Sequence, residues 1–353
     1  MQKVRVAVIY NAQSQDGLAL AVIRCLERAK KYEIFVIGES KKTNLSLSRG
    51  VNIINADLNF EQPDQVIQQL IQLNLQIKID LLLPICEKSI VFCETQKQQL
   101  DQFVKLVHTP PLASLDIALN KSVLAQYCVN NHISVPSLVN PHNYQGKFPL
   151  IAKPVSGQSG GNGIVSLHNS QQLNDHLATV GECSADYLYQ EKIAGVDIDI
   201  SVLCLNGEIK AYTIQQQVGE KDEPYLPPQS IRFVENQKLF NMTQDLMQKL
   251  NWSGIAHIDC ILDTHTQDIY ILEINSRYWQ SLLASHLAGV NFVDMACQMA
   301  LGNAVHFNGF TPITFGPIKV PLKKLLDKNY KTMLPIITRD WRPIFARLLS
   351  RFH

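Results

Sequence analysis

The pattern of apolar and polar positions changes after the first 84 residues. Up to that point, short apolar runs alternate with segments whose apolar residues recur at helical spacing. The runs predict strands at 4–10, 33–37, 51–55 and 79–84, and the spaced segments predict helices at 17–31 and 63–75. Such alternation is typical of a parallel sheet covered by helices. No G-x-G-x-x-G motif follows the first strand, which argues against a dinucleotide-binding fold.

The middle of the chain predicts shorter strands and a different topology. The turn at Thr109-Pro110-Pro111 is a candidate domain boundary, and a helix over 120–131 follows it. A small α+β unit is predicted from strands at 148–154, 164–167 and 187–193 and a helix at 171–179. The dipeptide Asn206-Gly207 between two apolar runs predicts a β-hairpin, and a helix is expected over 240–250.

Residues 254–263 and 269–279 form the most informative part of the sequence. Both segments are rich in β-branched and aromatic residues and flank a short polar turn, which predicts a second hairpin. If the turn closes with Asp263 opposite Ile269, then Asp259 lies opposite Glu273 and His257 lies opposite Asn275. Directly paired side chains in a hairpin are about 5 Å apart.

This register would place metal-binding oxygens and a cation on one face of the hairpin. Alternation of side chains puts Ile271, Glu273, Asn275 and Arg277 on that face. Two close carboxylates repel each other, and a hard divalent cation such as Mg²⁺ removes the repulsion. The alternative is an ordinary hairpin with a solvated polar face, which suits such apolar arms less well.

Composition limits the class of protein. The chain has 353 residues, 46% hydrophobic and 18% charged, which indicates a globular protein of two or three domains. Its formal charge of +1 gives no overall attraction to nucleic acid, so no nucleic-acid partner is expected. The eight cysteines form no C-x-x-C pair and most lie in apolar runs, which indicates reduced, buried thiols. The first ten residues predict a strand and no signal peptide, so a cytoplasmic location is expected.

A glycine-rich segment at 155–163 lies between two predicted strands. Its four glycines and two serines leave backbone N–H groups free to bind phosphate oxygens, and Lys153 just upstream supplies a positive charge. A flexible loop without a ligand is the alternative.

Three further positions are candidates. Glu191, at a strand end that turns at Gly195, suits the edge of an adenine base, with a surface Glu-Lys pair as the alternative. Lys121 in the first turn of a helix opposes the helix dipole, which points to an anion nearby. Arg232 could clamp a phosphate or carboxylate. For the last two, a solvated surface side chain is the alternative.

Taken in this order, the motifs resemble the ATP-grasp superfamily from about Asn120 to Gly302. The run Glu273-Ile274-Asn275-Ser276-Arg277-Tyr278-Trp279 is similar to the carbamoyl-phosphate-synthetase-like and biotin-carboxylase-like branch. The resemblance implies an α/β and α+β protein with the ATP-grasp fold: an N-terminal parallel α/β domain, a small lid subdomain and a central, mostly antiparallel sheet domain. The corresponding ranges are 1–114 for the N-terminal domain, 115–142 for a helical connector, 143–190 for the lid, 191–320 for the catalytic subdomain and 321–353 for a basic tail.

The resemblance also implies a role for each candidate residue. The ATP phosphates would be held by Lys121, Lys153, Ser156, Gly157, Ser159, Gly160, Gly161 and Gly163. Adenine would lie against Glu191 and the backbone of Lys192 and Ile193, and the ribose against Asp197. Mg²⁺ would bind Asp259, Glu273 and Asn275, and the catalytic cations would be Arg277, Lys153 and Arg232.

Three positions depart from the branch pattern. Ser276 replaces a common proline, and Asp197 and Asp259 each replace a more frequent glutamate. The shorter acids shorten the reach to a ribose and to a metal.

The implied activity is ATP-dependent ligation of a carboxylate to an amine through an acyl phosphate, with release of ADP and phosphate. ATP and Mg²⁺, or Mn²⁺ in its place, are the expected cofactors. The expected partners are a small-molecule carboxylate and an amine, with amino acids among the candidates. The alternatives are a biotin-carboxylase-like carboxylase and an ATP-binding regulatory module without catalysis.

Two regions outside the motifs carry further expectations. Glu87 follows the last strand of the N-terminal domain and could hold an amine, with a helix-capping glutamate as the alternative. The charged residues from Lys319 onward are mainly basic, and Trp341, Phe345 and Leu348 recur at helical spacing. This tail predicts a basic amphipathic helix that contacts its own domain, a second copy in a homodimer, another partner or a membrane surface.

Overall fold

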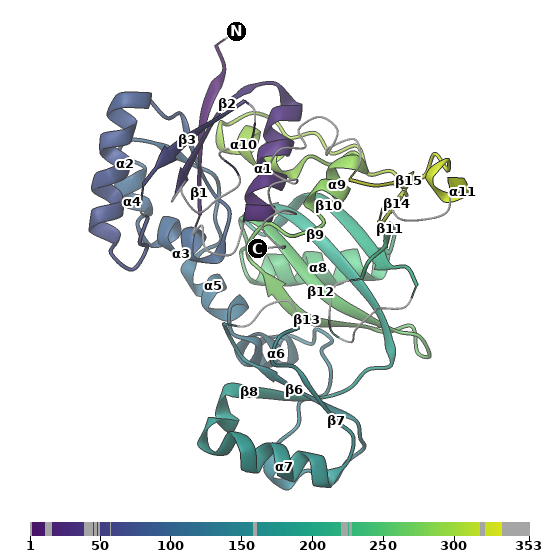
Figure 1. The fold of residues 1–353 in the computed structure, drawn as a ribbon. Helices are drawn as coiled ribbons and strands as arrows, with labels where there is room; N and C mark the ends of the chain where they lie inside the picture. The colour runs from purple at the N-terminus through teal and green to yellow at the C-terminus, as the bar shows by residue number, and fades with distance from the viewer. Residues whose placement is uncertain are drawn as a thin grey trace, which may run out of the picture.

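The computed structural model describes residues 2–10, 16–38, 45, 48, 50–56, 58–157, 161–219, 225, 228–317 and 322–333. Figure 1 shows three sheets, each with its own helices. The expected phosphate contacts Ser159 and Gly160 lie outside the described residues, as does the C-terminal helix predicted around Trp341.

The N-terminal sheet is parallel throughout, as the alternating pattern predicts. Its strand order is β3-β2-β1-β4-β5. The strands are β1 (Val4–Ile9), β2 (Tyr32–Gly38), β3 (Val51–Asn55), β4 (Leu81–Pro84) and β5 (Lys105–Leu106). Helix α1 (Asp16–Ala29) packs on one face, and α2 (Pro63–Ile77) and α3 (Glu87–Thr95) pack on the other. This order is that of dinucleotide-binding sheets. The prediction against a dinucleotide-binding fold was therefore wrong about the topology of this sheet. The glycine motif is a sign of phosphate binding, and its absence does not determine the order of the strands.

The second sheet belongs to the small α+β unit at the bottom of Figure 1. Strand β6 (Leu150–Pro154) lies between β7 (Val165–Leu167) and β8 (Tyr187–Glu191), and both pairs are antiparallel. Helix α7 (Ser170–Val180) covers the sheet by packing Leu173 against Leu150 and Tyr189.

The central sheet has seven strands in the order β13-β12-β9-β10-β11-β14-β15. Its bounds are β9 (Gly195–Leu205), β10 (Glu208–Gln217), β11 (Ile231–Phe233), β12 (Gly254–Asp263), β13 (Ile269–Asn275), β14 (Thr314–Phe315) and β15 (Tyr330–Lys331). All pairs are antiparallel except β14 with β15. Asn206 and Gly207 form the predicted turn, with φ angles of 51° and 80°. Strand β15 comes from the segment assigned to the basic tail, so the sheet extends into that segment.

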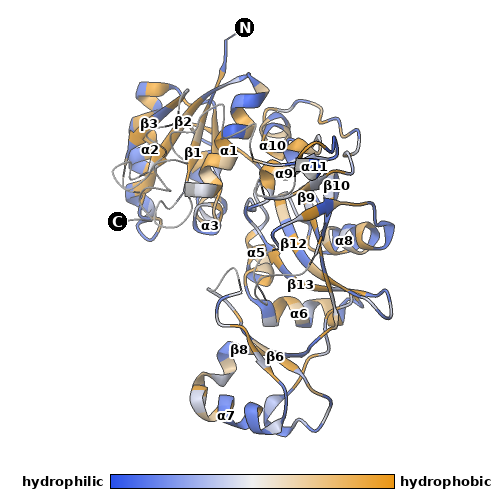
Figure 2. Ribbon diagram, turned by 45° about the vertical axis from the view of Figure 1, so that its right-hand side comes forward, coloured by the Kyte–Doolittle hydropathy of each residue, from blue (hydrophilic) through white to orange (hydrophobic). Residues whose placement is uncertain are grey.

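The two faces of the central sheet differ in polarity. One face is apolar and is covered by α5 (Leu112–Ala118), α6 (Lys121–Asn130) and α8 (Gln237–Lys249). On the other face, α9 (Leu282–Leu287) and α10 (Phe292–Ala300) cover one end, where Leu203, Ala211 and Ile255 are buried. The rest of that face carries acidic and amide side chains. In Figure 2 the strands of the N-terminal sheet are mainly orange, whereas β12 and β13 carry both colours.

None of the helices in the described part of the chain is both long and apolar enough to cross a membrane. All eight cysteines are free, and seven of them are buried. The prediction of buried thiols in apolar runs is confirmed.

Candidate active site

The β12–β13 hairpin brings the predicted metal-binding residues together. Asp259 pairs with Glu273, and His257 pairs with Asn275, as the sequence predicts. The turn is nevertheless one residue out of the expected register, because Ile269 pairs with Leu262 and not with Asp263. A β-bulge between these two regions, in which Leu272 is the extra residue, restores the register.

The bulge also changes which side chains share a face. Ile271 and Ile274 are both buried in the apolar core, while Glu273 and Asn275 lie on the opposite face. The prediction that Ile271 shares a face with Glu273 was wrong, because simple alternation ignores the inserted residue. The carbonyl of Leu272 accepts a hydrogen bond from Lys153 Nζ at 3.1 Å. The bulge therefore anchors the lysine that precedes the glycine-rich loop.

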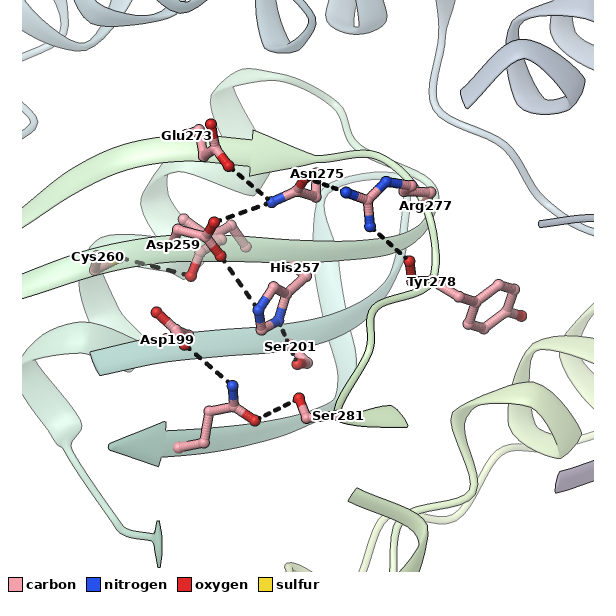
Figure 3. Close-up of polar contacts among 12 residues, drawn as sticks. Asp199, Ser201, His257, Asp259, Cys260, Glu273, Asn275, Arg277, Tyr278 and Ser281 are labelled. Atoms are coloured by element: carbon pink, nitrogen blue, oxygen red, sulfur yellow. Dashed lines mark hydrogen bonds and ion pairs between the residues drawn. The ribbon is translucent and has the colours of Figure 1, made fainter. Parts of the chain in front are cut away.

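Asn275 links the two carboxylates, as Figure 3 shows. Its Nδ2 atom donates to Asp259 Oδ2 at 3.2 Å and to Glu273 Oε1 at 3.4 Å, while its Oδ1 accepts from Arg277 Nη2 at 3.1 Å. Burial, and then repulsion from Glu273, raise the pKa of Asp259 well above its usual range. Three oxygen-bearing side chains on two adjacent strands thus concentrate negative charge at one point.

Two lysines from other elements offset this charge. Lys121, the first residue of α6, forms an ion pair with Glu273 at 3.1 Å, and its backbone N–H donates to Val155 O at 2.8 Å. Lys153 at the end of β6 is only 6% exposed. Burial lowers the pKa of Lys153 to about 8, although Glu273 opposes the shift. Burial alone would raise the pKa of Glu273, but Lys121 beside it brings the pKa below its usual range.

His257 is a site residue that the motifs did not identify. Its Nε2 lies 3.2 Å from Asp259 Oδ1 and its Nδ1 lies 2.9 Å from Ser201 Oγ, while its ring stacks on Trp279 with centroids 5.5 Å apart. Burial, and then the nearby Arg277, lower the pKa of His257 to about 3, so the ring is neutral at physiological pH. When the neutral ring accepts a hydrogen bond from Ser201 at Nδ1, its proton is on Nε2 and is donated to Asp259. This bond orients the Asp259 carboxylate, which is shorter than the glutamate common at this position.

A second polar network continues across the same face. Gln215 Nε2 donates to Asp199 Oδ2 at 3.0 Å, and Ser281 Oγ donates to Gln215 Oε1 at 2.7 Å (Figure 3). Ligand atoms of Asp199, His257 and Asp259 all lie within 4.8 Å of one another. The alternation along β9 and β12 could have indicated Asp199 and His257, but neither belongs to a motif.

Arg277 follows β13 and is held by three groups. Nη1 donates to Tyr278 O at 3.1 Å, Nη2 donates to Asn275, and Nε lies 3.5 Å from Glu87 Oε1. Glu87 is the first residue of α3. The contact therefore joins the N-terminal domain to the end of the β12–β13 hairpin.

The predicted adenine site lies at the end of β8. Glu191 Oε1 accepts from Tyr144 OH at 3.3 Å. The Lys192 N–H donates to Pro149 O at 3.1 Å. Asp197 pairs with Ile261 of β12, two residues from Asp259, so the ribose candidate lies beside the carboxylates.

The described part of the glycine-rich loop adopts backbone conformations that suit glycine. Gly157, Gly161 and Gly163 have φ angles of 75°, 80° and 75°. A Cβ atom at Gly161 would overlap the carbonyl oxygen of Tyr225, which lies between β10 and β11. The loop after β6 therefore contacts the central sheet domain. Ser156 follows directly after the strand that ends at Pro154.

Arg232 is not brought to this cluster. Its neighbours Ile231 and Phe233 pack against Ala284 and Ala288 of α9, so the arginine side chain points to the other face of the sheet. There its Nε donates to Thr314 Oγ1 at 3.4 Å. The surface alternative describes this residue better than a catalytic role.

The donor set fits a hard divalent cation. The carboxylates of Asp259 and Glu273 both contact the side-chain amide of Asn275, and carboxylate and carbonyl oxygens are the ligands that Mg²⁺ prefers. Rotation of the Asn275 amide would turn Oδ1 toward the carboxylates and release Arg277.

Residues 118–281, just under half of the chain, match the model of the family described as ATP-grasp domain. The carbamoyl phosphate synthase large chain of Thermomicrobium roseum is 25% identical over 173 residues, which cover 46% of this chain and 16% of that protein. The chain thus matches about a sixth of the length of this relative.

Solved structures share the fold at low sequence identity. The L-amino acid ligase from Bacillus licheniformis has a TM-score of 0.67 and 17% identity, with 89% of this chain and 79% of that chain covered. The biotin carboxylase domain of the 2-oxoglutarate carboxylase from Hydrogenobacter thermophilus has a TM-score of 0.67 and 13% identity, with 89% and 73% covered. It was solved as a dimer with MgADP, ADP and bicarbonate. The predicted superfamily and fold class are confirmed.

Proposed function

We propose that this protein is an ATP-dependent carboxylate–amine ligase that forms an acyl phosphate and releases ADP and phosphate. The observation that carries the proposal is the joint placement of Asp259, Glu273, Asn275 and Arg277 on one hairpin, with Lys121 and Lys153 in contact with it. Phosphoryl transfer needs positioned positive charge more than covalent chemistry by the protein.

Each group of residues at the site has a separate role in the proposed reaction. Asp259, Glu273 and Asn275 would hold Mg²⁺, which when bound would supply positive charge to the phosphates. Lys121 and Lys153 bind phosphate oxygens, and the loop from Ser156 to Gly163 covers them. Glu191, Ile193 and Asp197 bind the nucleoside. Arg277 orients the carboxylate against the γ-phosphorus atom and stabilises the charge that develops there.

The reaction balances in two steps. A carboxylate oxygen attacks the γ-phosphorus atom, and the bond from that atom to the bridging oxygen of ADP breaks. A neutral amine then attacks the acyl carbon, phosphate leaves with the former carboxylate oxygen, and the nitrogen loses a proton. Excluding water between the steps protects the acyl phosphate from hydrolysis.

The test is ADP release by the purified protein with Mg²⁺, pooled carboxylic acids and pooled amines, followed by separation of the pools. Hydroxylamine in place of the amine traps an acyl phosphate as a hydroxamate. ADP and hydroxamate that appear together support the proposal. Nucleotide binding without ADP release from any pool would overturn it and favour a regulatory module.

A carboxylase remains the second candidate, because one solved structure of the same fold contains bicarbonate. ADP release that requires both bicarbonate and biotin would favour this activity. Release that requires an organic acid and an amine excludes it.

A further inference from the structure

Glu87 makes one polar contact in the part of the chain that the structure describes. Its Oε1 lies 3.5 Å from Arg277 Nε, and no second hydrogen bond or ion pair of its side chain is present among those residues. The Glu87 side chain is 45% exposed and the Arg277 side chain is 19% exposed. The carboxylate therefore has unused acceptor capacity beside the arginine that faces the reacting group.

Hydrogen-bond capping of α3 does not account for Glu87. The first turn of this helix is capped by Ser89, whose Oγ accepts from the Cys86 N–H at 3.1 Å and donates to the Cys86 carbonyl at 2.8 Å. The helix-capping alternative is therefore filled by another residue. Glu87 instead extends from the carboxyl end of β4 toward the central sheet, where ligands of open α/β sheets bind.

Glu87 and Arg277 form a pair of opposite charges at the place where a substrate carboxylate must lie. An α-amino acid carries its ammonium and its carboxylate on one carbon atom, so the groups that recognise them must be close neighbours of opposite charge. Lys153 and Lys121 contact the Leu272 carbonyl and Glu273, which precede Arg277 along the chain by five and four residues. In the proposed function these two lysines bind the phosphate oxygens of ATP and not the substrate carboxylate.

We propose that the carboxylate activated by this protein belongs to an α-amino acid and that Glu87 binds its ammonium group. The inference rests on the proposed function and deepens it. Arg277 receives the carboxylate while Glu87 turns from Arg277 to the ammonium group. Simple carboxylic acids lack the ammonium group that Glu87 binds. When such an acid is bound, the Glu87 carboxylate has no cation from the substrate to pair with.

The experiment compares pairs of acids in the wild-type protein and two variants by hydroxamate formation, which reports the activation step alone. L-amino acids are compared one by one with the matching acids that lack the amino group, such as L-leucine with 4-methylpentanoate and L-phenylalanine with 3-phenylpropanoate. The variants are Glu87→Gln and, as a control of matched charge change in the same domain, Glu61→Gln. Glu61 pairs with Lys88 at 3.3 Å and does not contact Arg277.

In the wild-type protein, kcat/KM is expected to favour the amino acid. Glu87→Gln is expected to lower that preference roughly ten- to a hundredfold, the range for a hydrogen bond to a charged group. Glu61→Gln is expected to retain the preference.

Three results would overturn the inference and leave the ligase intact. These are equal use of both acids by the wild type, no change of the preference in Glu87→Gln, and an equal loss for both acids in that variant. The last result would mean that Glu87 only positions Arg277. Absence of hydroxamate with every acid would instead overturn the proposed function, and this inference with it.

Discussion

The two halves of the β12–β13 hairpin differ in their strand register and in the contacts of their charged side chains. On the turn side, Leu262 pairs with Ile269 and Asp268 forms an exposed ion pair with Lys238 at 2.6 Å. Beyond Leu272, Asp259 faces Glu273 and contacts His257 and Asn275, and Glu273 forms an ion pair with Lys121 of α6. The first half resembles any surface hairpin, whereas the second half gathers the charges of the candidate active site.

The bulge, and not the turn, therefore sets the strand register at the candidate active site. One extra residue moves Glu273 onto the face of Asp259 and frees the Leu272 carbonyl for Lys153. The following predictions use this division, in order of decreasing effect.

Glu273→Gln is expected to lower kcat about a thousandfold, because the variant loses a proposed metal ligand and the partner of Lys121. The matched change on the turn side, Asp268→Asn, is expected to leave kcat within about twofold, since surface ion pairs contribute little. Steady-state ADP release measures both, and circular dichroism checks folding. Equal losses in the two variants would contradict the division of the hairpin.

Deletion of Leu272 is expected to lower kcat roughly a hundredfold while the protein stays folded. The deletion turns the hairpin into a regular ladder in which Asp259 still faces the glutamate, but Lys153 loses its carbonyl anchor. Nucleotide affinity, measured by titration calorimetry, should weaken with it. Full activity in the deletion variant would show that the bulge has no role beyond register.

His257→Phe is expected to raise the Mg²⁺ concentration needed for half-maximal activity about 10- to 100-fold, the range for the partner of a metal ligand. The phenyl ring keeps the stack on Trp279 but cannot bond Asp259 or Ser201. His257→Gln, whose Nε2 extends as far as the histidine Nε2 and can still donate to Asp259, should recover part of the loss. A change in ATP affinity without a change in Mg²⁺ dependence would argue against this positioning role.

The pH dependence of ADP binding should follow the protonation of Lys153. With a folded pKa of about 8, this lysine is cationic below pH 8 and neutral above it, so ADP binding is expected to weaken above pH 8. Stability changes in the opposite direction. Between pH 8 and about 10.4 the unfolded chain holds a proton that folded Lys153 has lost, so burying this lysine is less unfavourable there. Fluorescence titration with a labelled ADP from pH 6 to 10 measures the effect, and a flat profile would contradict it.

Much of the fold was predictable from local pattern. The strands β1 to β4 and helices α1, α2 and α6 follow from periodicity, and Asn206-Gly207 fixes a turn through its positive φ angles. Residues 87–118 were not assigned, although α3, α4 (Lys97–Leu100), β5 and α5 lie there. These elements are short, and their apolar residues are set by contacts with distant parts of the chain.

The site was predictable where residues share a hairpin or a motif. The pairing of Asp259 with Glu273 followed from alternation, although an error in the turn and an unforeseen bulge cancelled each other. Arg232 was misjudged because its face depends on the packing of α9. The roles of Ser201 and Gln215 required the order of strands β12, β9 and β10, which distant pairings determine.

The contact of Gly161 with the carbonyl of Tyr225 has a consequence for the timing of turnover. In the proposed enzyme the glycine-rich loop covers the phosphates, so ADP leaves only after Gly161 and Tyr225 separate. Such an opening moves a segment of the protein through solvent. We therefore expect turnover with a good substrate to slow as solvent viscosity rises, whereas turnover limited by chemistry would not respond.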